Sequence, residues 1–394
     1  MPIEIIPVNT PAELERFIRV PMRLNAGDSN WVAPLMFERR EALSAKHNPF
    51  FEHAEVQFWL ATRDGRDVGR ISAQIDKLGR EDPDSPIGHF GLIAAEDDPA
   101  VFAALFSAAE AWLAERGRGQ VLGPFNLSIN EEVGLLVDGF DTPPMLMMGH
   151  DPRYVARRVE EQGYGKAKDV FAYISGVPEF TPGVQARLNR PLPPGVVLRP
   201  VRMKDFDAEV RTLVDILNEA WSENWGATPV TEAETKQVGE SLRLILHPRL
   251  IWFVEIDGEP AGFGVLLPNL NDAIHDLGGK LAPFGWAKLL WRLKVRGVKR
   301  GRVPLMGVKR RFAKDPRGAF APFLILDAFR REAVKLGITQ AEYSWILEDN
   351  LPMRHILESF GAHVYKTYRI YRKSLPGFVA SPRSPAATAE SLTL

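Results

Sequence analysis

The sequence contains no cysteine among its 394 residues. Disulfide bonds, a thiolate nucleophile and cysteine-ligated zinc are therefore excluded. Histidine is also scarce, with eight in the chain, and no group of histidine, aspartate and glutamate has the spacing of metal ligands. We therefore expect no metal site, and any group transfer must proceed without a thiol.

An excess of charge of either sign is missing as well. The chain has 49 lysines and arginines against 50 aspartates and glutamates, which gives a formal net charge of −1. Any basic surface must therefore be local rather than global, and we expect no nucleic-acid partner.

Long apolar runs are absent too. No stretch approaches the ~18–20 apolar residues that span a bilayer, and residues 1–10 lack the basic and apolar segments of a secretory signal. The sequence therefore predicts a cytoplasmic protein, either free or peripheral on the inner membrane. Its composition, 45% hydrophobic and 25% charged, is that of a globular chain long enough for two cored domains.

Hydrophobic periodicity and turn residues predict the same order of elements twice. In the first half, strands are expected at 3–8, 55–62, 67–76 and 87–94, with helices from residue 11 and over 99–116. In the second half, strands are expected at 196–200, 250–257, 259–267, 302–312, 341–347 and 364–371, with helices at 204–221, 321–336 and 353–360. This pattern predicts a duplicated α/β domain with a mixed sheet.

Composition sets the expected boundaries. Residues 180–195 are rich in proline and glycine, which is typical of a joint, so we expect domains at 1–179 and 195–375. Residues 277–301 break the symmetry as an insert in the second domain. The segment 376–394 is small, polar and proline-containing, so it is predicted to be a disordered tail.

The strongest chemical pattern lies at residues 306–325. An expected strand passes Val308 and ends in basic residues that include Arg310 and Arg311, and Arg317-Gly318 precede a helix. A helix N-terminus offers unpaired N–H groups and a positive dipole end, and arginines add charge. The segment is thus either an anion site suited to a pyrophosphate or a solvated basic turn.

A second pattern follows the strand at 341–347. Glu348 and Asn350 stand at its carboxyl end, where ligands gather in open α/β sheets. Glu348 is a candidate general base or a solvated loop acid, and Asn350 is a ligand-binding residue or a helix N-cap. Tyr371, on the last strand, is a candidate proton donor to a leaving group, although tyrosines on that strand also suit packing.

The first half has no comparable basic loop, because acidic Glu96-Asp97-Asp98 follow its strand and would repel a pyrophosphate. Its informative segment is the long loop at 123–140, which is rich in asparagine and glutamate. Asn126 and Asn130 are candidate substrate-binding residues, and Glu131 and Glu132 are candidate bases for an amine. The alternative is a turn network in which these side chains satisfy backbone groups. His53 and His150 are expected to be structural.

The insert reads as a basic amphipathic helix. The expected apolar face carries Trp286, Leu289, Leu290 and Leu293, and the basic face carries Lys288, Arg292, Arg296 and Lys299. Such a helix suits an anionic membrane surface, or it packs on its own domain with a wet basic face.

Together, these segments resemble the GNAT superfamily of N-acetyltransferases. There, an Arg-containing glycine loop grips the pyrophosphate of coenzyme A, and an asparagine in the place of Asn350 holds the pantetheine arm between two splayed strands. The chain departs from the loop pattern, because Phe320 and Pro322 occupy two positions that are normally small. The resemblance implies tandem GNAT-like domains, with a degenerate N-terminal copy and the acyl-CoA site in the C-terminal copy.

The chain is similar in kind to a bacterial tandem GNAT family that includes ceramide synthases. The segments that carry this resemblance are residues 25–34, 48–53 and 123–140. This resemblance implies direct amide formation between an acyl-CoA co-substrate and a lipid amine, with no permanently bound cofactor. A carboxylate would take the proton of the amine, and backbone N–H groups near the end of the Val308 strand would stabilise the oxyanion. Two other interpretations stay open: acylation of another amine, such as an aminoacyl or peptidyl group, and non-catalytic binding of CoA or lipid.

Overall fold

The computed structural model describes residues 2–79, 85–176, 180–245 and 247–376. The predicted disordered tail, apart from residue 376, lies outside these residues. In the first half the elements are β1 (Glu4–Pro7), α1 (Pro11–Leu24), α2 (Met36–Ala42), α3 (Phe50–His53), β2 (Ala54–Arg63), β3 (Arg66–Asp76), β4 (Ile87–Ala95), α4 (Pro99–Glu115), β5 (Gln120–Gly123), β6 (Phe125–Asn126), β7 (Glu132–Val133), β8 (Leu135–Asp138), α5 (Tyr154–Glu161) and β9 (Gly165–Ser175).

The second half repeats the order and adds the insert. Its elements are α6 (Pro182–Leu188), β10 (Val196–Pro200), η1 (Met203–Asp205), α7 (Phe206–Trp221), α8 (Glu232–Ile245), η2 (Pro248–Leu250), β11 (Ile251–Ile256), β12 (Glu259–Pro268), α9 (Asn271–Ile274), α10 (Gly285–Trp291), η3 (Arg292–Arg296), β13 (Arg300–Val308), α11 (Arg310–Ala313), α12 (Pro316–Lys335), β14 (Gln340–Leu347), α13 (Leu351–Glu358) and β15 (His363–Ser374). The predicted α/β fold with a mixed sheet is confirmed.

Local signals in the sequence explain many of these boundaries. Thr10 caps α1 in a reciprocal capping box with Glu13, as Ser/Thr followed by Glu at N3 favours. Gly337 ends α12 with φ +73°, a conformation that glycine adopts without strain. Two boundaries were predicted wrongly. The strand expected at 302–312 ends at Val308, because the chain turns into the helix α11 at Arg310. α12 begins at Pro316 rather than residue 321, because Asp315 accepts a hydrogen bond from the N–H of Arg317 and caps the helix there.

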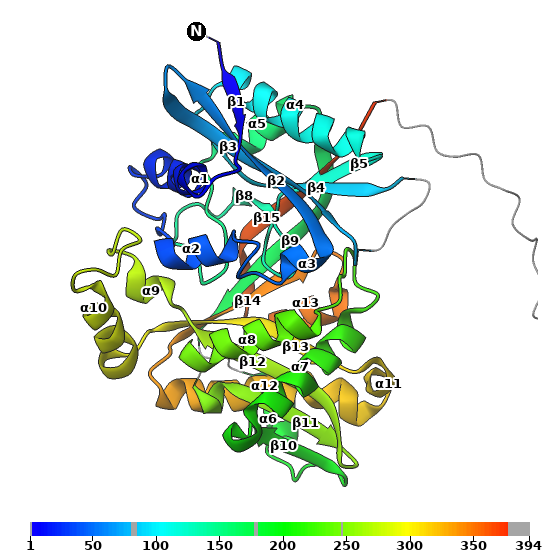
Figure 1. The fold of residues 1–394 in the computed structure, drawn as a ribbon. Coiled ribbons are helices and arrows are strands. Elements are labelled where there is room, and N and C mark those ends of the chain that lie inside the picture. The colour runs from blue at the N-terminus through cyan, green and yellow to red at the C-terminus, as the bar shows by residue number, and fades with distance from the viewer. Residues whose placement is uncertain (1, 80–84, 177–179, 246, 377–394) are drawn as a thin grey trace, which may run out of the picture.

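A single mixed sheet runs through both halves, in the order β1-β2-β3-β4-β5-β15-β9-β14-β13-β12-β11-β10 (Figure 1). Neighbouring strands are antiparallel except for the pairs β4–β5 and β13–β14, which are parallel. The last strand of each half pairs with the fifth strand of the other half: β15 with β5, and β9 with β14. The two strands also pair with each other, from His363↔Ile174 to Arg372↔Gly165. The domain boundaries expected at 1–179 and 195–375 therefore stay a prediction, since each half completes its sheet with a strand from the other.

Helices cover both faces of the sheet in each half. Along β2, Trp59 and Ala61 pack in the core under α4, whereas Phe58 and Leu60 pack in the core under α1. In the second half, α12 covers one face and α7 covers the other. A further core lies between the loop at 123–150 and the central strands β9 and β15. Each half therefore has one helix on each face of its sheet: α4 and α1 in the first half, and α12 and α7 in the second.

The parallel pair in the first half is closed by its own chain. β4 and β5 pair only from Ile87↔Gln120 to His89↔Leu122. Beyond that point Asn126 Oδ1 accepts a hydrogen bond from the N–H of Leu92 at 2.7 Å, so β6 fills the opening. Gly91 allows this approach, because a Cβ there would lie 1.8 Å from the carbonyl oxygen of Phe125.

We predict that Gly91→Ala destabilises the protein by ~1–3 kcal/mol or more, since an added methyl in a packed site forces backbone shifts. Gly183→Ala in α6 is the matched control, because nothing lies within 4 Å of the added Cβ. Urea unfolding of both variants is the measurement. Equal stability of Gly91→Ala and wild type would show that β6 does not fill this opening in solution.

Candidate active site

The parallel pair in the second half is open where its counterpart is filled. β13 and β14 pair from Arg300↔Gln340 to Val303↔Tyr343, and no further. β13 continues to Val308 beside β12, while β14 continues to Leu347 beside β9. The facing backbone edges of the two strands are therefore free of each other beyond Val303, as the resemblance implies for the pantetheine slot.

A cavity of about 370 Å³ begins at this opening. Residues of α7 and the following loop line one side, Met353 and Leu357 of α13 line another, and residues of the first half close the far end. Among the described residues, none of the lining side chains is an aspartate, glutamate, histidine, lysine or arginine. The lining residues are Leu78, Ile129, Asn130, Val133, Val170, Leu217, Asn218, Trp221, Ser222, Asn224, Trp225, Ala227, Thr228, Pro229, Val230, Val303, Pro304, Met306, Tyr343, Ser344, Trp345, Ile346, Leu347, Asn350, Met353, Leu357 and Ile370.

The basic segment after β13 differs from the expected open loop. Arg310–Ala313 form the helical turn α11, and the backbone oxygen of Phe312 packs against Gly318, where a Cβ would lie 2.1 Å from it. Gly318 thus serves close packing of α11 on α12. Phe320 is buried in the core beneath α12 rather than exposed on the loop.

Each arginine of this segment already has a carboxylate partner. Arg310 pairs with Glu223, and Arg311 with Glu259. Arg317 pairs with Asp257 at 2.9 Å and with Asp315 at 2.8 Å. These side chains are 31–53% exposed, and exposed pairs of this kind contribute only ~0–1 kcal/mol. A phosphate can therefore displace the carboxylates at little cost.

Asn350 and Glu348 follow β14 but lie in different surroundings. Asn350 caps α13 by accepting a hydrogen bond from the N–H of Met353 at 3.3 Å, and it also lines the cavity. Glu348 points away from the cavity lining: its carboxylate accepts from Lys166 Nζ at 2.6 Å and from the N–H of Asp169 at 3.2 Å. The structure therefore brings Asn350, but not Glu348, to the cavity wall.

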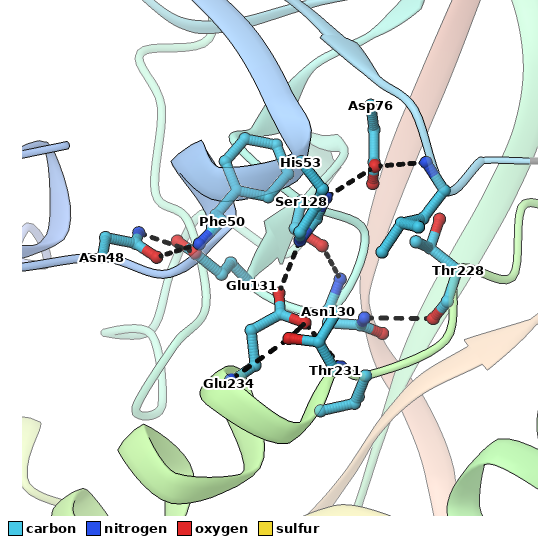
Figure 2. A network of polar contacts seen from close by, with 12 residues as sticks. Asn48, Phe50, His53, Asp76, Ser128, Asn130, Glu131, Thr228, Thr231 and Glu234 are labelled. Carbon is cyan, nitrogen blue, oxygen red and sulfur yellow. Dashed lines mark hydrogen bonds and ion pairs between the residues drawn. The ribbon is translucent and has the colours of Figure 1, made fainter.

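Glu131 and Glu132 do not line the cavity themselves, but they stand in the sequence between Asn130 and Val133, which do. Although part of its surface is accessible, the Glu131 carboxylate lies deep among protein atoms, and burial raises its pKa to about 8. Asn48 donates to it at 3.4 Å (Figure 2). Asn126 donates to Glu132 at 3.0 Å, and Arg39 lies 3.8 Å from the same carboxylate. A carboxyl group that ionises near neutral pH suits proton transfer.

Polar contacts join the two halves at this edge of the cavity. His53 lies between Asp76, 2.9 Å from Nδ1, and Glu234 of α8, 3.4 Å from Nε2 (Figure 2). Asn130 donates to the backbone oxygen of Thr228 at 3.2 Å. Both ring nitrogens of His53 are engaged, which agrees with the structural role that the sequence predicts. His150 is likewise buried, with Nε2 3.0 Å from Asp28.

Tyr371 is separated from the other candidate site residues. It is 1% exposed in the core under α4, and its hydroxyl donates to Glu160 at 3.1 Å. It does not line the cavity. The sequence placed it near the site because it expected the last strand to complete the second half, whereas that part of β15 pairs with β5 of the first half.

A buried polar cluster on β13 and β14, beside the cavity, was not predicted from the sequence. Arg302 donates to Ser344 Oγ at 2.8 Å and lies 3.4 Å from Glu342, which also accepts from Ser344 and Tyr365. Burial raises the pKa of Glu342. The Arg302 guanidinium lies 4.4 Å from the ring of Trp345, whose indole N–H is buried and has no partner in the part of the chain that the structure describes. The alternation of Glu342 and Ser344 with apolar residues on β14 was the available signal.

The insert exposes a different set of residues from the predicted face. Its large exposed apolar side chains are Phe284, Trp286, Leu290, Trp291 and Val295. Arg292 was wrongly placed on a wet basic face: it is buried, donates to the backbone oxygen of Ala273 at 2.7 Å and pairs with Asp276, which also binds Lys288. Lys288 and Arg292 lie one helical turn apart and share Asp276, so this face packs on the segment that carries Ala273 and Asp276 instead of facing water.

The described residues contain neither a membrane-spanning helix nor a metal-binding group. No helix among them is long and apolar enough to cross a membrane. No group of three or more histidine, aspartate or glutamate side chains there is arranged to hold a metal ion.

Comparison with known proteins identifies the family. No family profile matches the chain. It is 61% identical over 378 residues to the bacterial ceramide synthase of Caulobacter vibrioides (strain NA1000 / CB15N), covering 95% of this chain and 98% of that protein. It is 45% identical to protein YghO of Escherichia coli (strain K12), covering 92% and 93%.

Solved structures give the fold. A tandem GNAT protein from the clavulanic acid biosynthesis pathway superposes with a TM-score of 0.56 at 12% identity, over 97% of this chain and 100% of the other. A GCN5-related N-acetyltransferase from Sphaerobacter thermophilus gives 0.51 at 15% identity, over 94% and 96%. The expected tandem GNAT fold is therefore confirmed, and the chain is an acyl-CoA-dependent N-acyltransferase that belongs to the family of the bacterial ceramide synthase.

Proposed function

We propose that the chain transfers the acyl group of an acyl-CoA to the amine of a sphingoid base, such as 3-ketosphinganine or sphinganine, and so acts in sphingolipid biosynthesis. The observation that carries this proposal is the uncharged cavity that begins at the open β13–β14 slot. A water-soluble amine would need polar partners in such a cavity, whereas a lipid amine brings a chain that gains from apolar surroundings. The name of the Caulobacter relative agrees with this substrate class.

The reaction proposed is a direct transfer, since the chain has no cysteine to hold the acyl group. An amine with a pKa near that of lysine, ~10, is mostly protonated at neutral pH. A carboxylate removes that proton and the nitrogen attacks the thioester carbon. The C–S bond then breaks, and a second proton of the nitrogen passes to the departing sulfur, so that CoA leaves as the thiol. Glu131 is the base that we favour over Glu132 and Glu348, because its raised pKa lies near working pH and it adjoins Asn130 on the cavity wall.

We predict that Glu131→Gln lowers turnover by ~10²–10⁴, as loss of a general base does, while CoA binding stays intact. Because the ionised carboxylate is required and its pKa is raised to about 8, wild-type kcat/KM should rise with pH up to about 8 and then level off. Mass spectrometry of the amide formed from an acyl-CoA and sphinganine is the measurement.

Three variants complete this test. Glu132→Gln and Glu348→Gln identify the base if Glu131→Gln keeps its turnover, and the exposed Asp64→Asn is the control. Full turnover in all the glutamate variants would place the base elsewhere. Turnover with soluble amines and short acyl-CoAs but not with sphingoid bases would contradict the proposed substrate, and CoA binding without turnover on any amine would contradict the proposed reaction.

Acyl-CoA is proposed to bind the second half alone. The slot there is open, whereas β6 fills its counterpart in the first half. We propose that the backbone near Val308 and the side chain of Asn350 hold pantetheine, with Arg310, Arg311 and Arg317-Gly318 at the pyrophosphate. A carboxylate caps the corresponding helix in both halves, Asp98 on α4 and Asp315 on α12, so the proposal rests on the filled slot of the first half and not on the helix cap.

We predict that Arg317→Glu weakens CoA binding at least about tenfold, roughly 1.4 kcal/mol, since it replaces a cation near the pyrophosphate with an anion. Arg157→Glu is the matched control, because Arg157 is an exposed arginine paired with Asp97 near α4 of the first half. Isothermal calorimetry with CoA measures both. Unchanged affinity in a folded Arg317→Glu protein, or a loss in Arg157→Glu, would contradict the assignment.

The insert is proposed to attach the protein to an anionic membrane surface. Five large apolar side chains are exposed between residues 284 and 295, and Lys294, Arg296 and Lys299 have no ion-pair partner in the described part of the chain. Aromatic and aliphatic side chains beside free cations are typical of interfacial helices. The proposed lipid amine would be delivered from such a surface.

We predict that replacing Lys294, Arg296 and Lys299 with Gln weakens binding to anionic vesicles at low salt, since each cation contributes ~1 kcal/mol there. Trp286→Ser with Trp291→Ser should instead reduce the binding that survives in high salt, where charge is screened. The control replaces three exposed cations with Gln: Lys204 of η1, Arg211 of α7 and Lys236 of α8. Co-sedimentation that is equal for wild type and both insert variants would assign the insert to packing.

A further inference from the structure

The cavity reaches further than a pantetheine slot requires. The edges of β13 and β14, with α13, account for the part near Met353 and Leu357. The far end is closed by Val133 of β7, Val170 of β9 and Ile370 of β15. These three side chains are 5%, 2% and 1% exposed and belong to one core. Because β9 and β15 lie one and two strands beyond β14 as seen from the β13–β14 slot, they form an interior end wall rather than a mouth.

Burial along the cavity shows its direction. The residues of the loop after α7, such as Ser222 and Pro229, are exposed and lie at the mouth. Val303 and Tyr343, where the pairing of β13 and β14 ends, are buried. A thioester held in the slot therefore lies between the mouth and the end wall, and it has apolar space beside it.

Several polar side chains of the cavity already bond the protein itself. Asn218 bonds the N–H and the C=O of Val230, at 2.9 and 3.0 Å. Asn130 donates to Thr228, and Ser344 bonds Arg302 and Glu342. Groups that are already satisfied do not select a polar ligand. The indole N–H of Trp345 has no partner among the described residues, but most of the lining side chains are apolar, so the lining favours a hydrocarbon chain.

We propose that the end wall formed by Val133, Val170 and Ile370 receives the terminal methylenes of a hydrocarbon chain and sets the chain length that the enzyme prefers. This inference rests on the proposed N-acylation of a lipid amine. The chain is that of the acyl donor or that of the amine, and both present the same chemistry to the wall. Affinity should rise about fourfold with each methylene buried until the chain meets the wall, and fall beyond it, because overpacking is unfavourable.

The test changes the depth of the cavity in both directions. Val133→Ala and Val170→Ala should shift the preference toward longer chains, and Val133→Phe and Val170→Phe toward shorter ones. Turnover is measured with saturated acyl-CoAs of increasing length at a fixed amine, and then with sphingoid amines of increasing length at a fixed acyl-CoA. Val159→Ala is the matched control, since Val159 is fully buried in the core under α4 and away from the cavity.

Each outcome decides between the alternatives. A shift in the acyl series assigns the wall to the donor chain, and a shift in the amine series assigns it to the acceptor chain. No shift in either series, with folded and active variants, would overturn the inference while the proposed function stands. Calorimetric affinities of the acyl-CoA series, measured without an amine, keep the test of a donor-chain wall independent of turnover. If a Phe variant does not fold, the two Ala variants still decide.

Discussion

The pairing of β9 with β15 is the constraint on which the rest of the structure depends. These strands lie in the middle of the sheet, and each is the last strand of a different half. Their hydrogen bonds hold the two halves in one register, so the halves cannot separate without breaking the centre of the sheet. The cavity is built on this register, because Val170 of β9 and Ile370 of β15 close its end while β13 and β14 open its other side. The site is therefore formed between two halves that behave as one unit.

The two halves have the same fold but differ at the opening between their parallel strands, which is filled in the first half and open in the second. In both halves a parallel pair of strands separates after a few residues. In the first half Gly91 admits the chain at Phe125, and the amide oxygen of Asn126 takes the backbone hydrogen bond that a ligand would otherwise make. In the second half no segment within the described ranges fills the gap, and a cavity is present there. The loop between β6 and β7 of the first half places Asn130 on the wall of this cavity, with Glu131 next to it in the sequence.

Much of the fold follows from local signals, but the strand exchange does not. The hairpins, the capping box at Thr10 and the glycine ends of helices are visible in the sequence, because each depends on residues within a few positions. The partner of β15 depends on contacts between distant segments, and the sequence therefore placed Tyr371 near the site when it lies in the core of the first half. The same limit applies to the candidate site. Asn350 and Asn130 reach the cavity wall as strand-end and loop residues, whereas the salt bridge of Glu348 with Lys166 joins strands of different halves.

The order of the strands also bears on how the protein comes to be folded. A chain emerges from the ribosome N-terminus first, and domains generally fold as units in that order. Here β5 has to wait for β15, which ends at Ser374. Until β15 has been made, the first half keeps an unpaired inner edge at β5, and such edges favour wrong pairing with other chains. Because of the strand exchange, the first half completes its sheet only after β15 of the second half has been made.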